Sequence, residues 1–181
     1  MGFSVNFDRL PSKQALAFPV RKGSEDVVLK PKLDKNAKAS AIEFAVANND
    51  YQSIKQLAPK MGTKELTAML FLASALRTTN AQTIHMLVDF GADVKVRDSY
   101  GRTCLHEAAA FGNAETSIEL VKVGVEVDAV RRDGSTAAVE AGRLRHYEVV
   151  SALESMHANM GIKNKYGRSA DSYLKDLRRK L

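Results

Sequence analysis

Cysteine and tryptophan are almost missing from this chain. One of its 181 residues is a cysteine, Cys104, and none is a tryptophan. A lone cysteine excludes an intrachain disulfide and a cysteine-based metal site assembled by this chain alone. With 45% hydrophobic but only 7% aromatic residues, the core is expected to consist of Leu, Ala, Val and Ile side chains, a composition that suits packed helices.

Long apolar runs are missing as well. No uncharged stretch approaches the roughly 20 apolar residues that a membrane span needs. The first ten residues lack the basic and then apolar segments of a secretory signal. We expect one folding unit that does not enter a membrane and stays in the reducing cytoplasm. It would act in a host cytoplasm if it were an effector delivered by a route that reads no apolar signal.

Motifs that carry chemistry are few. His85, His146 and His157 have no metal-binding spacing, and no glycine-rich phosphate loop or Gly-x-Ser-x-Gly occurs. Cys104 and His106 suggest a nucleophile with its base, but residues two apart on a helix point about 200° away from each other. We therefore expect no catalysis, metal or cofactor, with a transferase or hydrolase built around Cys104 as the alternative.

A repeat of 33 residues is present instead. Its turns read Tyr100-Gly101-Arg102-Thr103, Asp133-Gly134-Ser135-Thr136 and Tyr166-Gly167-Arg168-Ser169, so the glycines stand at 101, 134 and 167, at intervals of 33. Further pairs keep this register: Ala108 with Ala141, Glu115 with Glu148, and Leu120 with Leu153. A period of this length is typical of stacked helical repeats.

One period predicts two helices and an extended link. Thr103 can cap the first helix, which carries an apolar stripe over residues 105–109 and ends at Gly112. A second helix follows and closes at Gly124, where glycine can take a left-handed conformation. Residues 125–130 then alternate between apolar and polar, as the arm of a hairpin does.

The central copy of the repeat carries a family resemblance. Asp98-x-x-Gly101-x-Thr103-Cys104-Leu105-His106-x-Ala108-Ala109-x-x-Gly112-Asn113-x-Glu115 is similar to an ankyrin repeat, with Cys104 where the family has Pro. The resemblance covers about residues 39–181 and implies an all-α ankyrin-repeat solenoid of helix-turn-helix units with hairpin-like links. It implies about four repeats, the first shortened to about residues 39–61, and a terminal half-repeat after Gly167. It also implies that His106 links neighbouring repeats by hydrogen bonds.

Residues 1–38 fall outside this resemblance. Pro11, Pro19 and Pro31 interrupt helices, and Phe3-x-Val5-x-Phe7 alternates like a short strand. The segment is too apolar for a purely solvated tail. We expect a partly ordered N-terminal extension, either an arm or a cap, ahead of a repeat domain at residues 39–181.

Positive charge gathers towards both ends of the chain. The net charge is +6, with 10 Lys and Arg against 6 Asp and Glu in residues 1–60, 6 against 9 in residues 61–130, and 11 against 6 in residues 131–181. The resemblance implies that a partner contacts the hairpin tips and the exposed ends of the first helices. The basic and aromatic residues at these positions are Arg77, Arg97, Tyr100, Arg102, Phe111, Arg131, Arg132, Arg143, Lys163, Lys165, Tyr166 and Arg168.

Such a basic and aromatic face predicts a protein partner with an acidic surface. Arg and Tyr are enriched at binding hot spots, and basic residues speed encounter with an acidic surface. We expect a monomeric, non-enzymatic adaptor or inhibitor. Nucleic acid is the alternative, since phosphates and bases suit the same residue types, although Asp98, Asp133 and Glu140 intrude on this face. Exposed charge without a binding role is a third interpretation.

Overall fold

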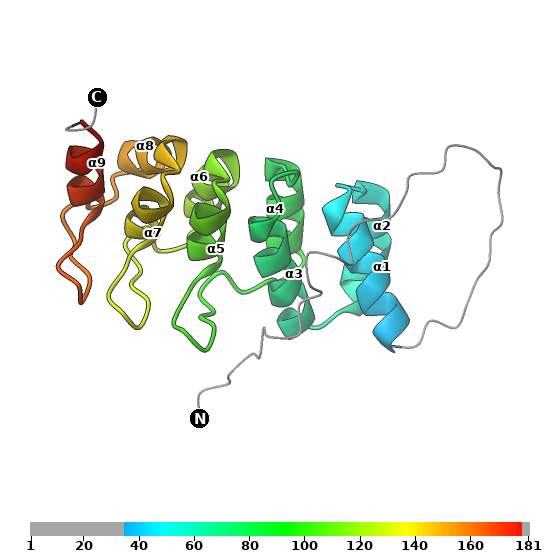
Figure 1. The fold of residues 1–181 in the computed structure, drawn as a ribbon. Helices are drawn as coiled ribbons and strands as arrows, with labels where there is room; N and C mark the ends of the chain where they lie inside the picture. Colours follow the sequence, from blue (N-terminus) through cyan, green and yellow to red (C-terminus); the bar gives the residue numbers. More distant parts are fainter. Residues whose placement is uncertain (1–34, 179–181) are drawn as a thin grey trace.

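Within residues 35–178, four helix pairs follow one another and a single helix closes the row (Figure 1). The computed structural model describes the backbone of residues 35–178 and the side chains of residues 41–175. The helices are α1 Lys35–Ala47, α2 Tyr51–Leu57 with a 3-10 turn η2 Ala58–Lys60, α3 Thr63–Ala75, α4 Ala81–Asp89, α5 Cys104–Phe111, α6 Ala114–Lys122, α7 Ala137–Leu144, α8 Tyr147–Ser155 and α9 Ala170–Arg178. This arrangement confirms the predicted four repeats with a terminal half-repeat.

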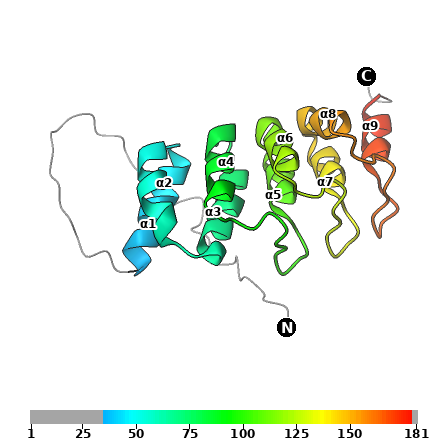
Figure 2. The same cartoon turned by 180° about the vertical axis from the view of Figure 1, so that it is seen from behind.

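The helices form two rows. The first helices of the pairs pack in the order α1, α3, α5, α7 and α9, and the second helices α2, α4, α6 and α8 pack behind them. Figures 1 and 2 show that the links before α5, α7 and α9 all project from the same edge of the stack. Of the predicted N-terminal arm, residues 1–34 lie outside the described residues, and residues 35–38 belong to α1.

Local capping explains where the helices begin and end. In α3 the backbone N–H of Gly62 donates to the Glu65 carboxylate at 2.9 Å, and this helix begins at Thr63. Asn113 caps α6 by accepting from the Thr116 N–H at 3.1 Å. Gly112, with a φ of 73°, takes the left-handed conformation that ends α5 just before this cap.

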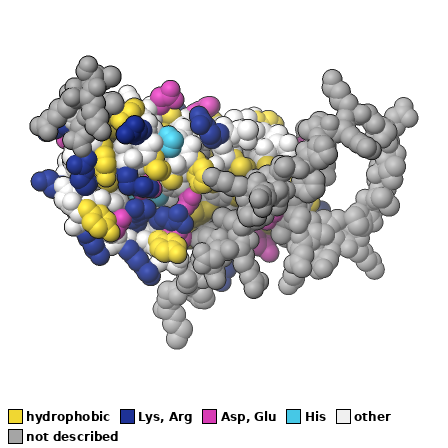
Figure 3. All heavy atoms as spheres, in the orientation of Figure 1, with side chains coloured by type: hydrophobic (Ala, Val, Ile, Leu, Met, Phe, Trp, Pro, Cys, Tyr) yellow, Lys and Arg dark blue, Asp and Glu magenta, His cyan; other side chains and the backbone are white. Residues whose placement is uncertain are grey.

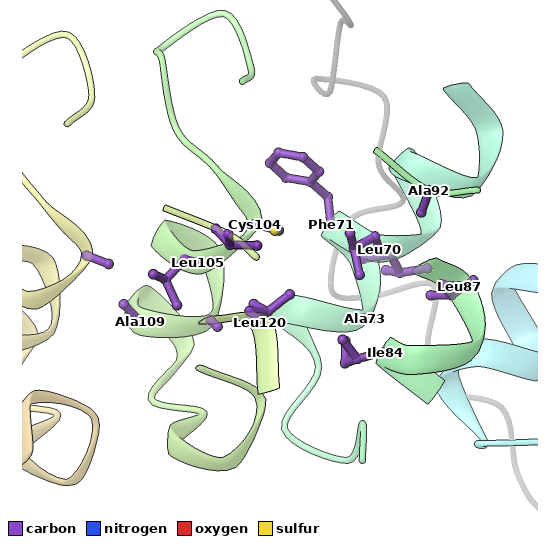
Figure 4. Close-up of a cluster of buried hydrophobic side chains, with 14 of the residues drawn as sticks. Leu70, Phe71, Ala73, Ile84, Leu87, Ala92, Cys104, Leu105, Ala109 and Leu120 are labelled. Atoms are coloured by element: carbon purple, nitrogen blue, oxygen red, sulfur yellow. The ribbon is translucent and has the colours of Figure 1, made fainter. Parts of the chain in front are cut away.

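The core is aliphatic, as the composition predicts. Figure 4 shows buried side chains of neighbouring repeats meeting between their helices, among them Leu70, Leu87, Leu105 and Leu120. All four are fully inaccessible to solvent. Because each repeat buries its apolar face only against its neighbours, the core runs along the stack instead of forming a central ball. Within the described residues, none of the helices is long and apolar enough to cross a bilayer.

Three hairpin-like links repeat the same turn. They comprise residues 97–102, 130–135 and 163–168, and are called the first, second and third hairpin links below. In the first, the Asp98 N–H donates to the Arg102 carbonyl at 2.9 Å, and its glycine, Gly101, has a φ of 76°. The glycines of the other two links have a φ of 79° and 70°. The predicted turn at the 33-residue spacing therefore recurs in all three links, each with a left-handed glycine, and the links contain no β-strand in the structure described.

Candidate interaction surface

The tips of the hairpin links are joined through their backbones. The Arg132 N–H donates to the Tyr100 carbonyl at 3.0 Å, and the Lys165 N–H donates to the Asp133 carbonyl at 2.8 Å. These two bonds connect the first link to the second and the second to the third. Side chains at the three tips are therefore held at a repeating spacing, in register with the 33-residue period.

His106 ties the second link to the helix beneath the first. Its Nδ1 accepts from the Thr103 N–H at 3.2 Å, which leaves the hydrogen on Nε2, and Nε2 donates to the Ser135 carbonyl at 3.1 Å. Burial lowers the pKa of His106 to about 4, so the ring is neutral near pH 7. The repeat-linking role that the resemblance implied is confirmed.

Cys104 precedes His106 by two residues on α5. It is buried and is not a ready nucleophile. Burial raises the pKa of its thiol to about 12, so the reactive thiolate is scarce near neutral pH. His106 has both ring nitrogens engaged in structural hydrogen bonds. The pair that suggested a nucleophile and its base serves the packing and hydrogen bonding of α5.

Carboxylates hold Arg102 in the first hairpin link. Its guanidinium contacts Asp98 at 2.6 Å and Glu107 on α5 at 2.7 Å. It also lies over the Tyr100 ring, 5.3 Å from the centroid. Burial raises the pKa of Glu107, but the adjacent Arg102 charge opposes that rise. Arg102 is thus fixed in place, with its charge largely offset by the protein itself.

Arg131 and Arg143 share a buried carboxylate. Glu140 on α7 is only 5% exposed, accepts a hydrogen bond from Arg143 at 2.5 Å and forms an ion pair with Arg131 at 3.3 Å. Arg131 also contacts Asp133 at 2.8 Å, and its hydrogen bonds lower the pKa of Asp133 to about 2. Arg97 is held too, by Glu126 at 3.0 Å and the Val130 carbonyl at 2.8 Å. Four of the predicted contact arginines are therefore paired within the molecule.

Three predicted contact cations differ from these. Arg132, Lys163 and Lys165 are exposed and have no ion pair with any residue that the structure describes. They lie on the second and third hairpin links, near two exposed aromatic rings, Tyr100 at 54% and Tyr166 at 75%. Figure 3 shows Lys and Arg side chains alternating with hydrophobic ones along the edge that the links form.

A cleft opens between the tips of the first and second hairpin links. Its lining residues are Tyr100, Arg102, Arg131, Arg132 and Asp133. Two of its arginines are already held by carboxylates, whereas Arg132 is not. The structure thus brings residues from two repeats to one small site.

Comparison with known protein families agrees with the helical repeat architecture. A family model described as ankyrin repeats, in three copies, matches residues 42–129 and 70–164, well over half of the chain. The chain belongs to the ankyrin repeat family. Ankyrin repeats are protein interaction modules and generally serve as non-enzymatic scaffolds. Interaction with other proteins is therefore the general function of this chain.

Relatives share the ankyrin repeats but are far longer. The chain is 32% identical over 129 residues to neurogenic locus notch homolog protein 1 of Xenopus laevis. It is 30% identical over 129 residues to neurogenic locus notch homolog protein 2 of Homo sapiens. The aligned part is 71% of this chain but 5% of each relative, so the likeness concerns the repeats and not those proteins as wholes.

The ankyrin stack separates some residues that the sequence grouped. Arg77 lies in the turn after α3, and Phe111 is the last residue of α5, so both sit at the end of a first helix away from its preceding link. Arg168, on the third link, lies 4.4 Å from the Tyr173 ring centroid on α9. The predicted surface is thus a basic link edge, with Arg77 and Phe111 placed apart from it.

Two acidic residues shape this edge more than the sequence indicated. The sequence indicates Glu140 only as an intruding charge and does not indicate a role for Glu107. Both stand on first helices, 33 residues apart, and both hold arginines. The sequence does contain a signal for these ion pairs. A carboxylate that recurs at the 33-residue period, close to the arginines of a hairpin link, indicates an ion pair within the protein.

Proposed function

We propose that this ankyrin repeat protein binds an acidic segment of another protein through the tips of its second and third hairpin links, as an adaptor or inhibitor. The observation that carries the proposal is the division of the basic residues into two classes. Arg97, Arg102, Arg131 and Arg143 are paired with carboxylates of the protein, whereas Arg132, Lys163 and Lys165 are exposed and unpaired in the described structure.

Unpaired cations are the better binding groups. A partner carboxylate that contacts a paired arginine must compete with the carboxylate already there, while one that contacts Arg132 or Lys165 displaces only water and counterions. The exposed rings of Tyr100 and Tyr166 lie on the same edge. Such rings supply apolar contact area and a hydroxyl for hydrogen bonding at an interface.

A protein partner fits this edge better than nucleic acid. Binding to a phosphate backbone draws on many uncompensated Lys and Arg residues. Here Asp98, Glu107, Asp133 and Glu140 offset the charge of the arginines around them. On the described part of this edge a short cluster of free positive charge is left, which suits a few carboxylates of a folded or extended partner.

We further propose that the protein works as a monomer in the cytoplasm, without catalysis or a cofactor. A reducing compartment keeps a lone thiol such as Cys104 reduced. Burial of this thiol favours a packing role in any case.

Affinity capture from the native cell tests the proposed surface. The double variant Arg132→Glu/Lys165→Glu should lose the acidic partner, because attraction becomes repulsion at two adjacent tips. The control Lys55→Glu/Lys60→Glu makes the same change in net charge at exposed positions of the first repeat and should keep the partner. Arg131 is unsuitable for this test because it holds Glu140.

Two results would contradict the proposal. Retention of the partner by the Arg132→Glu/Lys165→Glu variant, with an unchanged helical circular dichroism signal, would show that the partner binds elsewhere. Equal loss in both variants would indicate general charge attraction. A thymidine oligonucleotide serves as the nucleic-acid probe, and steeply salt-dependent binding to it in place of protein capture would favour the alternative.

A further inference from the structure

We propose that the cleft between the first and second hairpin links is a subsite for one glutamate side chain of the acidic segment. This inference rests on the proposed function and adds to it the identity of one recognised side chain. The cleft has Tyr100 and Arg102 on the side of the first link, and Arg131, Arg132 and Asp133 on the side of the second. It therefore lies where two repeats meet.

The walls of the cleft are held by backbone contacts. The Arg132 N–H donates to the Tyr100 carbonyl at 3.0 Å and so joins a residue of one wall to a residue of the other. A Cβ atom at Gly101 would lie 3.3 Å from the Arg132 nitrogen and 3.4 Å from the Arg131 Cα, so a side chain there would crowd the backbone of the second link. The width of the cleft is thus set before a ligand arrives, which lowers the entropic cost of binding.

Of the three arginines that line the cleft, two are paired with carboxylates and one can bind a ligand. Arg102 is engaged with Asp98 and Glu107, at 2.6 and 2.7 Å. Arg131 is engaged with Asp133 and Glu140, at 2.8 and 3.3 Å. Arg132 alone among the lining arginines has no ion pair in the part of the chain described. A single carboxylate matches a single free guanidinium, which can hold it through two parallel hydrogen bonds.

The Tyr100 ring in the wall of the cleft favours a ligand glutamate over a ligand aspartate. Tyr100 keeps 54% of its surface exposed although Arg102 lies over the ring. A ligand that reaches Arg132 past this ring gains by carrying an apolar stem. Glutamate has one more methylene than aspartate to place against the ring. The carboxylate of Asp133, also in the lining, disfavours a doubly charged phosphate in the same cleft.

Two ten-residue labelled peptides of equal charge, poly-glutamate and poly-aspartate, test the subsite by fluorescence anisotropy at low salt. The intact chain should bind poly-glutamate about fourfold more tightly, the value expected from one additional buried methylene. Tyr100→Ala should abolish the preference while binding itself persists and weakens with salt. Phe44→Ala is the matched control at an exposed ring on α1, outside the cleft and the hairpin links, and should keep the preference.

The outcomes separate the subsite from the proposed function. If the intact chain binds both peptides and the preference is the same before and after Tyr100→Ala, the subsite is overturned while the acidic-partner proposal stands. If neither peptide binds the intact chain at low salt, both proposals are overturned. A preference that Tyr100→Ala removes and Phe44→Ala leaves supports the subsite. A larger loss of poly-glutamate binding in Arg132→Gln than in Lys163→Gln supports the assigned cation.

Discussion

At the scale of single residues, the stack depends on polar side chains that are neutral or paired when buried. His106 is 1% exposed and makes hydrogen bonds to two repeats as a neutral ring. Burial lowers its pKa from 6.5 to about 4. Between these two values the unfolded chain binds more protons than the folded one, so stability rises with pH across this window.

The first prediction concerns this pH dependence. Replacing His106→Gln should lower the free energy of unfolding at pH 7 by about 1–3 kcal/mol, because the buried Thr103 N–H and Ser135 carbonyl lose their hydrogen-bond partner. The variant should also lose most of the rise in stability between roughly pH 4 and 6.5. Urea unfolding at several pH values measures both effects. The surface variant His157→Asn should keep the rise, and a full rise in His106→Gln would contradict the assignment.

A second prediction concerns Glu140, the carboxylate shared by Arg131 and Arg143. Glu140→Gln should lower the free energy of unfolding by about 1–3 kcal/mol, because two guanidinium groups lose their charged partner while the site stays buried. Urea unfolding at pH 7 gives the measurement. The exposed carboxylate Glu148 on α8 provides the control Glu148→Gln, whose effect should stay within about 0.5 kcal/mol. Equal stability of the two variants would show that the buried pairs contribute little.

At the scale of elements, the terminal helix α9 depends on one close contact with α7. A Cβ atom at Gly142 would lie 3.1 Å from the Tyr173 Cβ, which leaves little room for any side chain. Arg168 covers the same ring at 4.4 Å from its centroid. The glycine inside α7 therefore serves helix packing, at the expense of some helix propensity.

A third prediction follows for this contact. Gly142→Val should displace α9 and lower the free energy of unfolding by about 1–3 kcal/mol, as overpacking does. Amide exchange should accelerate in α9 before it does in α5. The control Ser151→Val places the same side chain at an exposed position of α8. Unchanged exchange in α9 of the Gly142→Val variant would mean that the contact does not position the helix.

At the scale of the whole molecule, each repeat is stabilised by its neighbours. α5 packs against α3, α6 and α7, whereas α9 packs against α7 with no later repeat beyond it in the structure described. Stability in such a stack is a sum of repeat and interface terms. The inner repeats have two interfaces each, so they should open less often than the C-terminal helix.

A fourth prediction expresses this gradient. Native-state amide exchange should be slowest in α5 and α7 and faster in α9, with the difference set by the number of interfaces that each helix has. Hydrogen exchange followed by mass spectrometry resolves these segments. Uniform exchange along all of them would indicate that the stack unfolds as one cooperative unit instead.

Prediction from sequence succeeded where the signal is local or periodic. The turn glycines and the 33-residue spacing are visible in neighbouring residues, and they predict the number of repeats and the positions of the links. The sequence did not predict which charged residues form ion pairs with each other. Glu107 and Glu140 neutralise arginines that precede them by five to nine residues and lie in other elements, and composition cannot show which charges face each other.

The sequence by itself determined the ankyrin architecture, because turn glycines, helix caps and apolar stripes act within one repeat and need no distant partner to be recognised. Only the tertiary structure decided which basic residues are available for binding. Stacking places Arg102 against Glu107, and Arg131 with Arg143 against Glu140, while Arg132, Lys163 and Lys165 stay exposed. The physical reason is that the free charge of a side chain depends on what the fold places within a few ångströms of it.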